Sequence, residues 1–171
     1  VPGLRPVVPL AGPVEETVRA VAANWHPAPI LLHDVAGKYD AFAAARESGG
    51  AGLIKSGTSS LEVALAGVPM AVGYRVNPIS AAIARRLIQV KYVSIVNLLA
   101  EAEIIPEYLQ ERCTPELLAA ELVRLLTEPE AAAAQRAGFA RVLTMLRPAE
   151  GIPSEAAAAA VLEMIEAGQP V

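Results

Sequence analysis

The sequence has little of what marks a disulfide-rich, metal-binding or nucleic-acid-binding protein. Its 171 residues include one cysteine, Cys113, which has no intrachain partner for a disulfide. His26 and His33 stand seven residues apart with prolines between them, so they do not form a metal pair. The formal net charge of -4 provides no basic surface for phosphates. We therefore expect no metal, no other cofactor and no nucleic-acid partner.

Long apolar runs and aromatic side chains are scarce as well. No stretch reaches the roughly 18 to 20 apolar residues of a membrane-spanning helix, and residues 1–5 lack a signal-peptide pattern. With the unpaired cysteine, these absences predict a cytoplasmic protein that is soluble or peripheral on a membrane. Aromatic residues make up 4% of the chain and hydrophobic residues 54%, so small aliphatic side chains must build the core.

Short apolar segments bounded by glycine or proline predict buried strands. They are residues 6–10, 29–33, 52–55, 69–74 and 92–96. Helical spacing occurs between them, in residues 14–24, 59–66 and 78–86. Alternating strands and helices predict the α/β class, with a Rossmann-like parallel sheet covered on both faces.

From Thr114 onward the pattern is helical only. Thr114 is a good N-cap and Pro115 suits the first helical position. The expected helices are residues 116–126, 129–146 and 154–167. We therefore expect a Rossmann-like domain over residues 1–112. Residues 113–171 would be added helices that pack on it or on a domain outside this chain.

The loop before residue 60 carries the most specific chemical pattern. Ser56, Gly57, Thr58 and Ser59 link a predicted strand to a predicted helix. Free N–H groups at a helix start attract anions, and small side chains let a phosphate approach the backbone. Glu62 lies one turn further, where a carboxylate can accept hydrogen bonds from a ribose diol. The pattern predicts a nucleoside diphosphate site, although it is neither a P-loop nor a G-x-G-x-x-G fingerprint.

Helix capping explains the same residues equally well. A serine at a helix start followed three residues later by glutamate forms a capping box, and Ser59 with Glu62 fits that spacing. Spacing alone does not distinguish a helix cap from a ligand site. The two are also compatible, because the hydrogen bonds of a cap can be replaced by hydrogen bonds to a ligand.

Other polar residues stand near predicted strand or helix ends. Arg75 follows a strand, where open α/β sheets place ligands, although a surface arginine is the commoner case. Asn97 ends a predicted strand, where its amide either satisfies a turn or faces a ligand. Arg85, Arg86 and Lys91 form a small basic cluster. Such a cluster can attract anionic lipid, or it can be the solvated end of a helix.

No catalytic residue emerges from these patterns. Ser56, His33 and Asp34 give no sign of the ordered roles of a triad. Asp34 and Asp40 likewise do not make a convincing acid–base pair.

Several ordered segments resemble lipid-A-disaccharide synthase. They are SGTSSLEVALAGVPM at residues 56–70, GYR at 73–75, IARRL at 83–87 and YVSIVNLL at 92–99. The likeness continues through IPEYLQE at 105–111 and TPELL at 114–118. It covers most of residues 6–146 and is far more specific than one loop.

The resemblance implies a metal-independent glycosyltransferase of the two-Rossmann-domain (GT-B) type. Such an enzyme transfers 2,3-diacylglucosamine from its UDP donor to 2,3-diacylglucosamine 1-phosphate and so forms the lipid A disaccharide. The carboxy-terminal domain of that family holds UDP. Its serine-glycine-threonine loop falls on residues 56–58, its ribose-binding glutamate on Glu62 and its asparagine on Asn97.

The sequence departs from the family at its amino-terminal side. It lacks the upstream domain, with its catalytic acidic residue and acceptor pocket, and the glycine-serine-arginine loop. We therefore expect a donor-binding half without its first strand, inactive alone, whose lipid acceptor binds elsewhere. An apolar face on the last helix would favour association into a homo-oligomer.

Two alternatives stay open at this point. One is another UDP-N-acetylglucosamine transferase or epimerase domain, against which the Asn97 segment argues. The other is a non-catalytic nucleotide-binding module.

Overall fold

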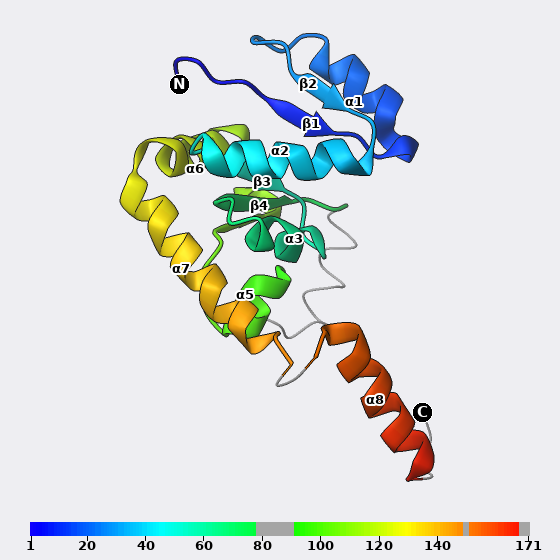
Figure 1. The fold of residues 1–171 in the computed structure, drawn as a ribbon. Coiled ribbons are helices and arrows are strands. Elements are labelled where there is room, and N and C mark those ends of the chain that lie inside the picture. Colours follow the sequence, from blue (N-terminus) through cyan, green and yellow to red (C-terminus); the bar gives the residue numbers. More distant parts are fainter. Residues whose placement is uncertain (78–90, 149–150, 168–171) are drawn as a thin grey trace.

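The computed structural model describes residues 1–77, 91–148 and 151–167. It contains two parallel sheets (Figure 1). In the first sheet, β1 (Val7–Pro9) pairs with β2 (Ile30–Leu32). The second has the order β3-β4-β5, formed by Gly52–Ile54, Met70–Tyr74 and Glu107–Leu109. Every strand pair is parallel, which confirms the α/β class predicted from the sequence.

Helices connect and cover these strands. The amino-terminal ones are η1 (Gly12–Val14), α1 (Glu15–Ala22), α2 (Val35–Glu47) and α3 (Ser59–Leu65). The later ones are α5 (Ile95–Ala100), η2 (Gln110–Arg112), α6 (Pro115–Thr127), α7 (Pro129–Met145) and α8 (Pro153–Glu166). The predicted N-cap of α6 is confirmed, because Thr114 Oγ1 accepts a hydrogen bond from Leu117 N at 3.4 Å.

The strand predicted at residues 92–96 is wrong. Ser94 is instead the N-cap of α5, and its Oγ accepts a hydrogen bond from Asn97 N at 3.3 Å. The β-branched residues Val93, Ile95 and Val96 imitate a strand because branching at Cβ favours extended backbone. The last strand is β5, further along the chain than expected. The helix expected at residues 78–86, with Arg85 and Arg86, lies outside the described residues.

The two sheets are separated by a helix. In Figure 1, α2 lies between the β1–β2 pair above and the three-stranded sheet below. Among the described residues, both outer strands of each sheet have one edge without a ladder partner: β1 and β2 in the first sheet, β3 and β5 in the second. Phe42 and Ala45 of α2 pack against the main core, so this helix links the two parts.

The main core lies between the three-stranded sheet and helices α3, α5 and α7. Its buried members are Val63, Ala64, Val68, Met70, Val72, Val96, Ile105, Phe139 and Val142. Burying one large apolar side chain contributes about 2 kcal/mol of folding free energy. Phe139 and Val142 of α7 belong to this core, so residues on both sides of the expected boundary at residue 112 pack together.

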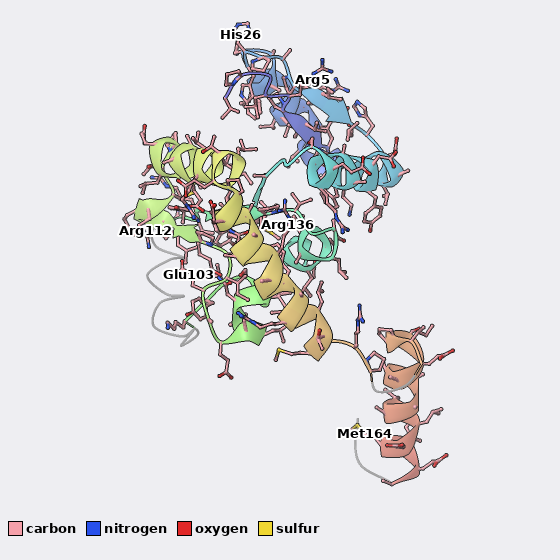
Figure 2. The ribbon with its side chains drawn as sticks, turned by 60° about the vertical axis from the view of Figure 1, so that its left-hand side comes forward. Arg5, His26, Glu103, Arg112, Arg136 and Met164 are labelled. Carbon is pink, nitrogen blue, oxygen red and sulfur yellow. The ribbon has the colours of Figure 1, made fainter. Side chains whose placement is uncertain are left out.

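Helix α8 stands apart from the rest of the molecule (Figures 1 and 2). It has no buried residue, and Leu162, Met164 and Ile165 are all exposed. Its presence and that of α7 confirm the two helices predicted for this part of the sequence. Within the described residues, none of the helices is both long and apolar enough to cross a membrane.

Candidate functional site

The small-residue loop connects β3 to α3 at the carboxyl edge of the three-stranded sheet. Gly57 has φ of +142°, a conformation that residues with an L side chain rarely adopt. A Cβ added to Gly57 would meet no heavy atom within 4 Å. Glycine is therefore needed for its backbone angle, and the space above it is open.

Among the described residues, the backbone N–H groups of Gly57, Thr58 and Ser59 have no hydrogen-bond acceptor. No backbone hydrogen bond of the described residues is donated by Gly57, Thr58 or Ser59, whereas Ser60 N and Leu61 N donate to the carbonyls of residues 57 and 58. Because α3 has only seven residues, its dipole is short. The three successive N–H donors are the stronger reason to expect an anion here.

The carboxylate of Glu62 forms an ion pair and does not cap α3. Its Oε2 accepts a hydrogen bond from Lys38 Nζ of α2 at 2.9 Å. Neither hydrogen bond of a capping box between Ser59 and Glu62 occurs among the described residues. The ion pair raises the pKa of Lys38 above its ordinary value, chiefly through this hydrogen bond. The capping explanation is therefore wrong in this structure.

Cationic side chains follow the ends of the neighbouring strands. Lys55 comes directly after β3 and Arg75 directly after β4, and both are exposed. Carboxyl ends of parallel strands meet at one edge, so these cations share an edge with the small-residue loop. Gln110 fixes the backbone beside Arg75, since it accepts from Val76 N at 2.7 Å and donates to Val76 O at 3.2 Å.

Arg112 follows the third strand at the same edge. Its guanidinium carbon lies 5.6 Å from the ring centroid of Tyr108, and Figure 2 shows its position beside the sheet. Cations therefore follow all three strands of this sheet.

Asn97 is buried and is not open to solvent at this edge. It is 0% exposed, and its Oδ1 accepts hydrogen bonds from Ile104 N at 2.8 Å and Ile105 N at 2.9 Å. Its Nδ2 donates to Ile105 O at 2.7 Å and to Glu107 Oε1 at 2.9 Å. Both ends of the amide are thus occupied by the protein, and the arrangement holds α5 against the segment before β5.

Three residues at or behind the site were not singled out from the sequence. They are Lys38, Glu107 and Gln110, each of which contacts a segment distant in the sequence. Only the helical and strand spacing around them is visible in a sequence, and it does not reveal such partners. For Gln110 a positive φ of 50° is an added sign that the chain turns there.

Other site types find little support within the described ranges. These residues include no group of three or more His, Cys, Asp or Glu placed to hold a metal ion. Two surface hollows lie away from the loop, one beside α7 at Glu103 and Arg141 and one between α2 and α3 at Phe42 and Ala66.

The strands are parallel and are joined by crossover helices, and small residues and cations lie along one carboxyl edge of the sheet. This arrangement defines a Rossmann-like α/β domain. A family profile described as lipid-A-disaccharide synthetase matches residues 1–161. The chain belongs to the lipid-A-disaccharide synthase family. This finding confirms the resemblance noted in the sequence.

Curated relatives agree with that membership. Lipid-A-disaccharide synthases from Gluconobacter oxydans and Granulibacter bethesdensis are each 48% identical to this chain over 96% of its length. The enzyme of that name from Rhodospirillum centenum is 44% identical over 96%. The matches cover 39%, 44% and 40% of these three relatives, so the chain spans about two fifths of their length.

Proposed function

We propose that this chain is the part of a lipid-A-disaccharide synthase that binds the UDP moiety of the sugar donor. The complete protein would transfer 2,3-diacylglucosamine from its UDP carrier to 2,3-diacylglucosamine 1-phosphate. The chain alone would bind the donor without turnover, because the acceptor pocket and the catalytic acidic residue would belong to a domain outside it.

One observation carries this proposal. The chain belongs to this family, and its loop of residues 56–59 presents three backbone N–H groups, those of Gly57, Thr58 and Ser59, that have no acceptor among the described residues. The space next to Gly57 is open. Such a group of donors suits the oxygens of a diphosphate, and glycine lets these oxygens approach the backbone. Lys55 and Arg75 would add positive charge where the phosphates lie.

Glu62 would hold the ribose of the nucleotide. Its Oε2 is bonded to Lys38, whereas its Oε1 has no partner among the described residues. A free carboxylate oxygen can accept hydrogen bonds from the ribose hydroxyls. Lys38 would stay bonded to Oε2 during binding and would not contact the nucleotide itself.

Asn97 would support the site from behind. With both ends of its amide bonded to the protein, it would fix α5 near the loop and would not touch the nucleotide in this arrangement. This role fits a buried polar group whose hydrogen bonds are all satisfied.

Several expectations about the complete protein stay predictions. They are the cytoplasmic location, contact with an anionic membrane surface, association into a homo-oligomer, and a domain boundary at residue 112. Among the alternatives, family membership favours a lipid A enzyme over another UDP-N-acetylglucosamine transferase or epimerase. The second alternative, a non-catalytic nucleotide-binding module, would apply to the chain by itself. It would not apply to the complete enzyme of which we propose that the chain is a part.

The Gly57→Ala variant tests the loop. A Cβ on a residue with φ of +142° forces the loop to change, so we expect affinity for UDP to fall about tenfold or more. Isothermal titration calorimetry measures this change. Gly49→Ala is the matched control, because Gly49 also has positive φ (72°) and open surroundings but lies in another turn. Equal affinity losses in the two variants would contradict the proposal.

A further inference from the structure

Glu107 is a buried carboxylate that the donor-binding proposal does not use. It is the first residue of β5 and is 9% exposed. Its Oε2 accepts from Val93 N at 2.9 Å, and its Oε1 accepts from Ser94 N at 2.8 Å and from Asn97 Nδ2 at 2.9 Å. No Lys, Arg or His forms an ion pair with it within the part of the chain that the structure describes.

Burial of a carboxylate is costly unless hydrogen bonds replace its water. Here the N–H donors that replace it come from Val93, Ser94 and Asn97, at the start of α5. Both carboxylate oxygens are used as acceptors. An amide in the same place has one acceptor oxygen and one NH2 group, and the NH2 group would face an N–H donor. The site therefore requires a carboxylate and not merely a polar side chain.

One peptide group connects this carboxylate to the small-residue loop. The N–H of Ser94 donates to Glu107, and the C=O of Val93 belongs to the same peptide group. That carbonyl accepts a hydrogen bond from Ser56 Oγ at 2.7 Å, across 37 residues of sequence. A peptide group is planar, so fixing its N–H also fixes its C=O. Hydrogen bonds at both ends also polarise it and strengthen one another.

We propose that Glu107 is a positioning residue for the diphosphate loop. Its carboxylate holds the peptide group between Val93 and Ser94, and this group anchors the hydroxyl of Ser56 where the loop begins. Ser56 is accordingly an anchor of the loop, and the N–H groups of Gly57 and Thr58 are left to face the ligand. The effect of Glu107 on ligand affinity rests on the proposed function, whereas its effect on the loop does not.

The Glu107→Gln variant tests this connection in the ligand-free protein and with ligands. Backbone amide NMR signals of Gly57 and Thr58, as well as of Val93 and Ser94, are expected to move. Affinity for UDP is expected to fall about tenfold, while affinity for uridine, which lacks phosphates, changes less than about twofold. Unchanged signals of Gly57 and Thr58 in a folded variant would overturn the proposal without reference to any ligand.

Glu121→Gln is the matched control. Glu121 is also a buried carboxylate, 7% exposed, but on α6, where it bonds to Tyr108 and Arg124. It should leave the loop signals and the ratio of UDP to uridine affinity unchanged. If Glu121→Gln changes them as much as Glu107→Gln does, general destabilisation is the cause and the positioning role is overturned.

Ser56→Ala completes the test. If the connection passes through Ser56, Glu107→Gln causes no further loss of UDP affinity in a Ser56→Ala background; additive losses would contradict it. If Glu107→Gln does not fold, the Ser56→Ala variant tests the proposal by itself. Unchanged amide signals of Gly57 and Thr58 in that variant would show that Ser56 does not anchor the loop and would overturn the proposal. If loop signals move as expected but the unaltered protein binds no UDP, the proposed function fails while the connection stands.

Discussion

At the scale of single residues, Glu62 and Lys38 have different expected effects. The two side chains are 37% and 27% exposed, and partly exposed ion pairs contribute less than about 1 kcal/mol to stability. Lys38→Met should therefore lower the free energy of unfolding by less than that and leave UDP affinity within about twofold. Glu62→Gln should cost equally little stability but lower UDP affinity about tenfold, through weaker bonds to the ribose. Urea unfolding and calorimetry measure the two quantities.

Deoxyuridine diphosphate provides the control for this pair. Removing the 2′-hydroxyl should lower affinity for the unaltered protein and should matter less to Glu62→Gln. Equal affinity losses in Lys38→Met and Glu62→Gln would contradict the assignment of the ribose contact to Glu62 alone.

At the scale of elements, α7 approaches the chain before β5 too closely for any side chain at Gly138. A Cβ there would lie 2.5 Å from Ile104 Cγ2. Alanine favours a helix over glycine by about 1 kcal/mol, but overpacking costs about 1 to 3 kcal/mol. Gly138→Ala should therefore lower the free energy of unfolding by about 1 kcal/mol, as urea denaturation would measure.

A double-mutant cycle identifies the cause of that loss. In an Ile104→Ala background the Cβ of residue 138 has room, so Gly138→Ala should be neutral or stabilising there. Losses that add in the double variant would show that the contact with Ile104 is not responsible.

Local sequence patterns predicted some elements and misled for others, for physical reasons. The strand at 52–55, α3 and α7 have clear boundaries in glycine, proline and apolar spacing. Residues 92–96 have strand-like branching, yet they form the cap and start of α5, because Glu107 binds the N–H groups of Val93 and Ser94. A contact with a residue over ten positions away is invisible to local propensity. Helix α2 is rich in alanine and has no distinct apolar face that would predict it.

The candidate site shows the same limit. The loop of residues 56–59 and Glu62 could be predicted, because small residues before a helix and an acidic residue one turn later are local features. The partner of Glu62, Lys38, lies 24 residues away on another helix. The family likeness drew attention to Asn97, whose buried hydrogen bonds are with residues 104, 105 and 107. The structure thus gives a physical role to Asn97, which the resemblance had only pointed out: its amide holds α5 against the segment before β5.

At the scale of the whole molecule, one core holds together elements from residue 42 to residue 142. The candidate site lies at an edge of the three-stranded sheet that this core supports. Arg136 of α7, labelled in Figure 2, also donates to Gly67 O at 3.1 Å, just after α3. Helix α7 is therefore part of the support for the site, whereas α8 is not.

The measurement that tests donor binding most directly is calorimetric titration of the purified chain with UDP, with ATP as the control nucleotide. Circular dichroism should first confirm that the chain is folded. Our proposal predicts saturable binding of UDP with a stoichiometry near one and no comparable binding of ATP. A folded chain that binds neither nucleotide, or both equally well, would contradict the proposal that this chain forms the donor site.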